Sequence, residues 1–162
     1  MSPAEQYQQL LAQSGITKDT GQQRVVDLLE ALYQLLIARN RQRSTWSRLL
    51  GRGNDTPVKG LYIWGGVGRG KTMLMDLFCD CLPRELQLRM HFHRFMRRVH
   101  DELTRLSGTA NPLEQVADNF AAQSRVLCFD EFFVSDIGDA MILGELLGLL
   151  FDRGVTLVAT SN

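Results

Sequence analysis

The sequence predicts an α/β fold in which a parallel sheet is covered by helices on both faces. From residue 58 to residue 162, short apolar runs alternate with helical patterns, the order expected of parallel strands joined by crossover helices. A glycine-rich segment lies between the first of these runs and the next helix. Acidic and polar residues follow two later runs, at the edge of a parallel sheet where ligands bind.

The N-terminal part of the chain is expected to be helical. Residues 4–13 predict a short helix ended by Gly15, and residues 22–38 carry an apolar stripe at positions 25, 29, 32 and 36, which is helical spacing. Segment 39–57 is basic and then rich in Gly, Asn, Asp and Pro, so it predicts a loop. We therefore expect a helical segment with a linker over residues 1–57 and a core over residues 58–162.

The core is expected to contain four strands and the helices between them. The strands are predicted over 58–64, 86–95, 124–132 and 155–162, and the helices over 71–82, 95–108, 112–123 and 136–151. Asn111 and Glu114 around Pro112 are typical of a capped helix start. Ser135 or Asp136 is expected to cap the last helix.

Composition excludes several classes of protein. Net charge is zero and the pI is near 6.8, which argues against a protein that coats nucleic acid. Three cysteines and a polar N-terminus without a signal core indicate reduced thiols in the cytoplasm. No apolar run approaches the roughly 20 residues that span a bilayer. The chain ends on a predicted strand, so we expect it to be part of a longer protein.

The segment GGVGRGKT, residues 65–72, matches the pattern G-x-x-x-x-G-K-[ST]. Glycines let successive N–H groups turn inward around phosphate, and the next helix points its N-terminus at the same anion. Lys71 is expected to reach the β- and γ-phosphates, and the Thr72 hydroxyl to ligate Mg²⁺. The alternative is a glycine turn beside an exposed lysine. The predicted nucleotide-binding residues are Gly65, Gly66, Val67, Gly68, Arg69, Gly70, Lys71, Thr72 and Met73.

Two acids follow the apolar run at residues 126–129. Asp130 is expected to hold Mg²⁺, directly or through water, and Glu131 to orient and polarise the attacking water. The alternative is a pair of solvated carboxylates that end a strand. A strand and two helices lie between Lys71 and Asp130, which suits NTPases with an extra strand between the two motif strands. The glutamate favours hydrolysis over nucleotide-kinase chemistry.

Two further positions are candidates for nucleotide contact. Asn162, after Thr160 and Ser161, is expected to sense the γ-phosphate at the same sheet edge; a turn or helix cap is the alternative. Gln22 could read the adenine edge by donating and accepting, although a helix start capped by Asp19 or Thr20 explains the local pattern equally well.

Histidines and arginines form two weaker patterns. His91 and His93 would share one face of a strand, but with His100 on the next helix no complete metal site is expected. The basic residues Arg89, Arg94, Arg97 and Arg98 interleave with Phe92 and Phe95. Such interleaving can bind single strands, but a solvated helix face above buried phenylalanines is the simpler interpretation. The cysteines are interpreted as core residues.

At a larger scale, several stretches resemble one family. GLYIWGGVGRGKT, HFHRFM, VLCFDEFFVSDI and LVATSN together resemble the ZapE family of bacterial cell-division ATPases, which belong to the AAA+ class and have mitochondrial relatives. The resemblance covers about Asp19 to Asn162, the N-terminal half of such proteins. It implies an ATP- and Mg²⁺-dependent hydrolase in the cytoplasm at the division site that destabilises polymers of the tubulin-like protein FtsZ.

The resemblance has structural implications too. It implies a fifth strand beside strand 58–64, self-association into an AAA+ oligomer, and arginines beyond Asn162, one from a neighbouring subunit. A peripheral position on the inner membrane is compatible with it. Without the fifth strand, strand 58–64 would be an apolar edge that favours self-association.

Two alternative functions stay open. A helicase-loader-like AAA+ protein would bind single-stranded DNA through an exposed arginine–aromatic face, although the neutral pI makes nucleic acid an unexpected partner. A nucleotide-gated scaffold would work without turnover, but it would be expected to lack the acid at Glu131. Mitochondrial relatives act on membrane proteins, and the ATPase core does not distinguish these clients.

Overall fold

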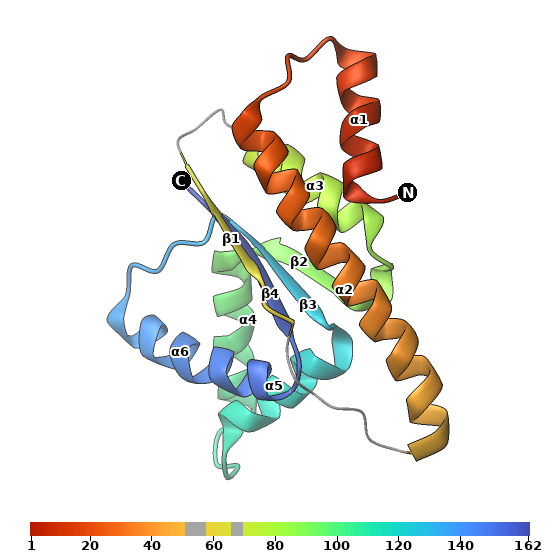
Figure 1. The fold of residues 1–162 in the computed structure, drawn as a ribbon. Helices are drawn as coiled ribbons and strands as arrows, with labels where there is room; N and C mark the ends of the chain where they lie inside the picture. Colours follow the sequence, from red (N-terminus) through yellow and green to blue (C-terminus); the bar gives the residue numbers. More distant parts are fainter. Residues whose placement is uncertain (51–57, 66–69) are drawn as a thin grey trace.

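The computed structural model describes residues 1–50, 58–65 and 70–162, with side chains of residues 44–50 outside the description. The helices are α1 (Pro3–Ser14), α2 (Thr20–Leu50), α3 (Lys71–Cys81), α4 (Phe92–Arg105), α5 (Pro112–Gln123) and α6 (Ile137–Asp152), with a 3₁₀ turn at Arg84–Leu86. The strands are β1 (Leu61–Trp64), β2 (Gln87–His91), β3 (Val126–Asp130) and β4 (Thr156–Ser161). Figure 1 shows their arrangement.

The four strands form one parallel sheet in the order β1-β4-β3-β2. His91 pairs with Asp130 at the carboxyl end of β2 and β3, and Trp64 pairs with Ser161 at the carboxyl end of β1 and β4. All four strands therefore end at one edge, which confirms the predicted parallel α/β sheet. In the described part of the chain, β1 lies at one end of the sheet, with Tyr62 and Trp64 exposed.

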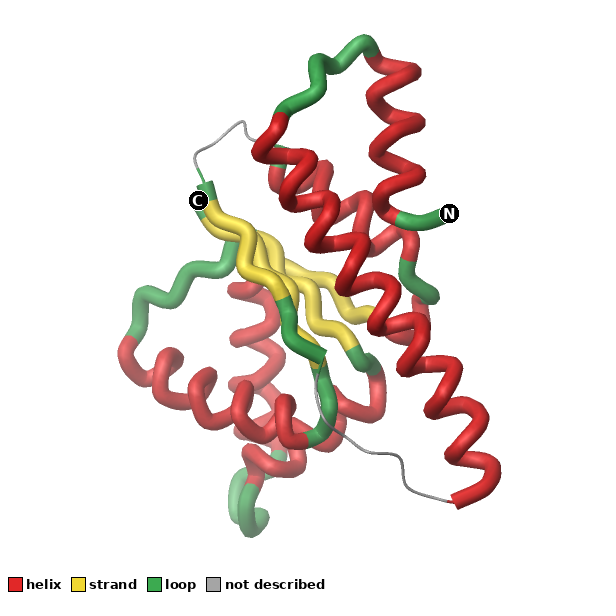
Figure 2. The backbone as a smooth tube through the Cα atoms, in the orientation of Figure 1, coloured by secondary structure: helices red, strands yellow, loops and turns green. Residues whose placement is uncertain are grey.

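Helices cover both faces of the sheet, and each face has its own apolar core (Figures 1 and 2). On one face, α1, α2 and α3 pack over Ile63, Cys128 and Val158. On the other, α4, α5 and α6 pack over Leu127, Phe129 and other strand residues. Neighbouring residues of β3 thus enter opposite cores, which explains why its four residues 126–129 are all buried and apolar.

The predicted N-terminal helices form, with local caps. A capping box between Ser2 and Glu5 starts α1, and Gly15 ends it in the left-handed conformation with φ 63°. The carboxylate of Asp19 accepts hydrogen bonds from the N–H groups of Gly21 and Gln22, so Asp19 caps the start of α2. Whether residues 1–57 form a unit separate from the core stays a prediction.

The prediction of a loop from residue 39 is wrong, because α2 continues to Leu50. Residues 39–50 contain no Gly or Pro, and Arg, Gln and Leu are good helix formers. Their basic, polar character is compatible with a solvated helix, and the Gly- and Pro-rich part of the predicted loop begins only at Gly51, outside the described residues. No helix in the described part of the chain is both long and apolar enough to cross a membrane.

The second strand is shorter than predicted. It ends at His91, and α4 begins at Phe92, so the expectation that His91 and His93 share a strand face is wrong. Phe92, Phe95, Met96 and Val99 are all buried, and their spacing is that of one helix face. Burial of this helix face against the sheet therefore explains why β2 ends and α4 begins between His91 and Phe92.

Smaller differences concern strand and helix starts. The first strand begins at Leu61 instead of residue 58, although the carbonyl of Val58 still accepts a hydrogen bond from the Thr156 hydroxyl. Asn111 precedes α5 with φ 51°, and its side chain makes no capping bond, contrary to the prediction. Asp136 caps α6 as expected, because its side chain accepts the N–H of Asp139.

Candidate nucleotide site at the carboxyl edge of the sheet

A polar cavity of about 380 Å³ lies where the strands end. Its walls come from the start of α3, from β2, from β3 with the residue after it, and from the end of β4. The lining residues are Gly70, Lys71, Thr72, Arg89, His91, Asp130, Glu131, Thr160, Ser161 and Asn162. The cavity therefore brings together the three chain segments that the sequence predicts to bind one ligand.

The start of α3 supplies one wall. Gly70 precedes the helix with φ 75°, and a Cβ at this position would lie 2.8 Å from Nε2 of Gln22. The ammonium of Lys71 donates to the carbonyl of Gly65 at 2.5 Å, and Thr72 is exposed on the first turn. The helix N-terminus and this lysine are suited to an anion. Gly66, Val67, Gly68 and Arg69 lie outside the described residues.

Gln22 lies beside this wall from α2. Its amide nitrogen is near Gly70, and its amide oxygen accepts a long hydrogen bond of 3.4 Å from the buried hydroxyl of Tyr7. The predicted contact between Gln22 and the adenine base stays a prediction. The structure places this side chain beside the first turn of α3, whereas the sequence left a base contact and a helix start as equal alternatives. Met73 lies next to Gly70 but packs its side chain against the apolar core.

Asp130 is held from the neighbouring strand. Arg89 on β2 donates from Nε to Oδ2 of Asp130 at 2.8 Å and from Nη2 to Oδ1 at 3.2 Å. Its remaining nitrogen, Nη1, donates to Asp76 on α3. The hydrogen bond with Asp130 is the main reason that the pKa of Arg89 lies above its ordinary value, with a further rise from Asp76 against a lowering by burial.

This role of Arg89 is not predicted from the sequence, in which Arg89 is one of the basic residues interleaved with Phe92 and Phe95. A signal was available. Arg89 lies between Leu88 and Met90 in a strand of a sheet expected to be covered on both faces, where a charge needs a partner. The register puts Arg89 opposite Cys128, two residues before the His91–Asp130 pair.

Glu131 is placed differently from Asp130. Its side chain is 72% exposed, and its carboxylate lies 3.7 Å from Nδ1 of His91. Its backbone has φ 54°, a left-handed conformation that is unfavourable for a side chain of this kind. The following residue, Phe132, donates its N–H to the carbonyl of Thr160 at 2.8 Å and contacts the ring of Phe92. These contacts of Phe132 force the turn in which Glu131 lies.

The end of β4 supplies the last wall. Thr160 is buried, whereas Asn162 is exposed and lines the cavity. The carbonyl of Ser161 accepts the N–H of Gly65 at 3.3 Å, which ties the end of β4 to the start of the glycine-rich segment. Asn162 thus lies in the cavity that also contains Lys71 and Glu131.

The chemistry of the lining residues fits Mg²⁺ bound together with a polyphosphate. Carboxylate and hydroxyl oxygens, as in Asp130 and Thr72, are the donors that Mg²⁺ prefers, and it commonly takes only one or two of them beside phosphates and waters. In the part of the chain that the structure describes, no group of three His, Cys, Asp or Glu residues could hold a metal by itself. His91 and His93 stack at 5.7 Å between ring centres, and His100 pairs instead with Asp139 at 2.6 Å.

The predicted arginine–aromatic face is not a continuous surface. Phe92 and Phe95 are buried, with 3% and 0% exposure. Arg98 lies over the ring of Phe120 and donates to Gln123. Arg94 and Arg97 are exposed, but without exposed phenylalanines they provide charge alone, not a stacking platform. The simpler interpretation, a solvated helix face above buried phenylalanines, is therefore correct for α4.

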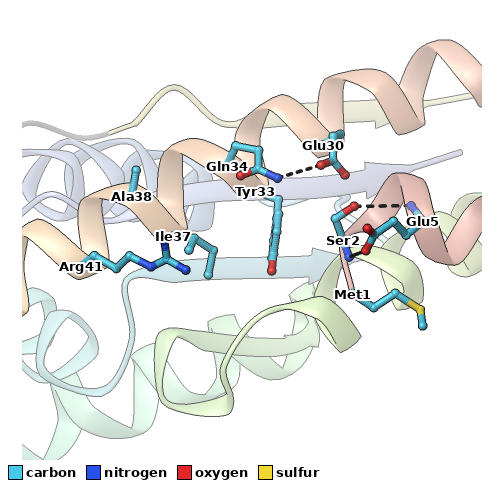
Figure 3. A pocket seen from close by; sticks show the side chains of 9 residues that line it. All are labelled: Met1, Ser2, Glu5, Glu30, Tyr33, Gln34, Ile37, Ala38 and Arg41. Atoms are coloured by element: carbon cyan, nitrogen blue, oxygen red, sulfur yellow. Dashed lines mark hydrogen bonds between the residues drawn. The ribbon is translucent and has the colours of Figure 1, made fainter.

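A second cavity is lined by residues of α1 and α2 and by the two residues before α1 (Figure 3). Glu30 accepts hydrogen bonds from the N–H of Ala4 and from Gln34 in this region. Burial raises the pKa of Glu30, but these hydrogen bonds lower it by more, so the pKa is below its ordinary value. None of the cavity's lining residues belongs to the predicted nucleotide site, so we interpret this cavity as part of the packing of the N-terminal helices.

Comparison with known proteins gives one family and several relatives. The model of the family "AFG1-like ATPase" matches residues 1–162. The chain is 52% identical to the cell division protein ZapE of Escherichia coli K12. The match covers all of this chain and 46% of that protein. It is 44% identical to lactation elevated protein 1 homolog B of Danio rerio over 65% of the chain and 23% of that protein. The chain thus spans about half the length of its bacterial relatives.

Solved structures share the fold at low sequence identity. The helicase loader DnaC matches with a TM-score of 0.55 and 14% identity, covering 91% of the chain and 73% of DnaC. DnaI matches with a TM-score of 0.56 and 17% identity, covering 93% of the chain and 71% of DnaI. These similarities confirm the AAA+ type of fold, and at such identities they extend to the fold alone.

Proposed function

Because the chain belongs to the AFG1-like ATPase family, we propose that it binds Mg²⁺-ATP at the carboxyl edge of the sheet and takes part in its hydrolysis. One observation carries the proposal. A single cavity is lined by Lys71 and Thr72, by Asp130 and Glu131, and by Asn162, which are far apart in the sequence. Phosphoryl transfer requires just such a gathering of cationic, metal-binding and water-orienting groups.

Each group has a distinct role in this proposal. The glycine-rich segment 65–70 and Lys71 hold the phosphates, and Thr72 and Asp130 hold Mg²⁺. When bound, Mg²⁺ neutralises charge on the phosphate oxygens. Glu131 accepts a proton from the attacking water, and its exposed side chain leaves room for that water. Asn162 hydrogen-bonds the γ-phosphate or the water, and Gln22 contacts the base.

The client is proposed from the bacterial relatives. ZapE is by name a cell division protein, and this chain is expected to act in the same process. We propose that the whole protein forms an AAA+ oligomer, with an arginine from a neighbouring subunit completing the site, and destabilises FtsZ polymers at the division site in the cytoplasm. Clients among membrane proteins are the alternative that the family resemblance implies, and a peripheral position at the inner membrane would suit either client.

A single-strand-binding function is less well supported. The fold of helicase loaders is shared, and Arg94 and Arg97 are exposed. The aromatic residues that would stack on bases are buried, so the main contribution to sequence-independent single-strand binding is missing from this face.

The first test is Mg²⁺-dependent ATP hydrolysis by the whole protein, with and without FtsZ polymers. Single-stranded DNA serves as the second addition, and Glu131→Gln gives the background rate. Stimulation by FtsZ polymers alone supports the proposal. Stimulation by DNA alone supports the loader-like alternative. Hydrolysis no faster than in Glu131→Gln, with nucleotide still bound, would identify a nucleotide-gated scaffold and contradict the enzymatic part of the proposal.

A further inference from the structure

Arg89 forms hydrogen bonds with the carboxylate of Asp130, the group that is expected to bind the metal. Its guanidinium bonds both oxygens of the Asp130 carboxylate, at 2.8 and 3.2 Å. This two-point geometry is the strongest that an arginine makes with a carboxylate. The side chains of Arg89 and Asp130 are 26% and 14% exposed, so water screens the pair only in part.

Asp76 gives the same guanidinium a second anchor. It lies on α3 four residues after Thr72, and residues at this spacing share one helix face. Arg89 donates to Asp76 from Nη1, the nitrogen that Asp130 does not use. The Asp76 side chain is 52% exposed, so it can keep the guanidinium at the rim of the cavity while Asp130 changes partner.

We propose that Arg89 holds the Asp130 carboxylate in the metal-free protein and competes with Mg²⁺ for it, and that Asp76 keeps Arg89 when the metal is bound. The inference rests on the proposed nucleotide site. It makes Arg89 a positioning residue that sets how much Mg²⁺ strengthens nucleotide binding. It also connects β2 to the same face of α3 that presents Thr72, so metal binding changes the contact between these elements.

The measurement is the affinity of the whole protein for a fluorescent ADP analogue, with excess Mg²⁺ and with EDTA. The dissociation constant with EDTA divided by the dissociation constant with Mg²⁺ gives a ratio that measures how much the metal strengthens binding. Arg89→Gln removes the competing charge and is expected to raise this ratio about fivefold, the effect of one like charge at ~4 Å in a well-solvated setting. Arg105→Gln removes an exposed arginine at the end of α4 and is expected to leave the ratio unchanged.

A double-mutant cycle separates competition at Asp130 from general electrostatics. Arg89 also attracts nucleotide phosphates at a distance, and that effect persists when Asp130 is replaced by Asn. In the Asp130→Asn background, Arg89→Gln is therefore expected to change the ratio less than about twofold, because pairs that do not interact give additive effects. An equal change in both backgrounds would overturn the inference, since it would show long-range attraction only.

Asp76→Asn gives a second, milder variant with the opposite expected sign. Without Asp76, Arg89 has only Asp130 as its carboxylate partner in this network, so the ratio is expected to fall below that of the wild type. An unchanged or lower ratio in Arg89→Gln, in protein that still binds nucleotide, would overturn the inference but not the proposed function. Failure of the wild-type protein to bind nucleotide at all would overturn both.

Discussion

The cavity at the sheet edge has two dissimilar regions, although the acids at their centres are neighbours in the chain. Around Asp130 the structure is closed: the side chain is 14% exposed and Arg89 bonds both of its oxygens. Around Glu131 it is open: the side chain is 72% exposed and its carboxylate lies 3.7 Å from Nδ1 of His91. A fixed carboxylate suits a metal, and an accessible one suits a water molecule.

The difference arises from the point at which β3 ends. Asp130 is the last residue of the strand, in register with His91, so the neighbouring strand β2 can supply its partner. Glu131 lies just beyond the strand, in a turn with φ 54° that the Phe132–Thr160 hydrogen bond fixes. One position is therefore determined by sheet pairing, and the other by a strained turn.

The largest expected effect tests the open region. Glu131→Gln keeps the size of the side chain but removes its ability to accept a proton, so ATP turnover should fall by about 10²–10⁴-fold. The free energy of unfolding should change little, because the side chain is mostly exposed. Steady-state hydrolysis and urea denaturation measure the two quantities. Glu145→Gln, an exposed position on α6, is the matched control and should retain turnover.

The closed region is expected to show the reverse pattern, with an effect on stability. Asp130→Asn removes the carboxylate that binds the half-buried Arg89 at two points and leaves it only the exposed Asp76, so it should lower the free energy of unfolding by about 2 kcal/mol. Asp76→Asn removes a partner of the same arginine at a position that is 52% exposed, and should cost less than about 1 kcal/mol. Urea denaturation without nucleotide compares the two variants.

The ordering of these two variants is the critical result. An equal loss of unfolding free energy in Asp130→Asn and Asp76→Asn would mean that burial does not distinguish the two partners of Arg89. If Glu131→Gln lowered the free energy of unfolding as much as Asp130→Asn does, the division of the cavity into a closed and an open region would be contradicted.

Sequence patterns predicted the fold, and chain segments that line the cavity, better than the contacts between their side chains. Alternating apolar runs and the segment around Lys71 determine the parallel sheet and its carboxyl edge, because these depend on local periodicity and on glycine content. The boundary at His91 was missed, since an apolar strand and the start of an amphipathic helix overlap in 86–95. Only burial of Phe92 and Phe95 under the sheet resolves that ambiguity.

The contact of Arg89 with Asp130 depends on the order of the strands. The two residues are 41 positions apart, and the local sequence around either one does not predict a contact with the other. They meet because β2 lies beside β3. The predicted helix is shorter than α2 for a different reason. The second half of α2 is basic, which is typical of a solvated loop, but it contains no Gly or Pro before residue 51 to end the helix.

The smallest expected effect concerns the backbone of Glu131. A glutamate at φ 54° is strained, whereas Asn tolerates this conformation better than most side chains. Glu131→Asn should therefore be more stable than Glu131→Gln by about 0.5–1 kcal/mol, while both variants lose turnover. Both substitutions remove the same charge, so their difference in urea denaturation isolates the backbone contribution. A less stable Asn variant would show that the turn does not strain residue 131. A more stable one would indicate that the open region gives up stability to hold an accessible carboxylate over the cavity.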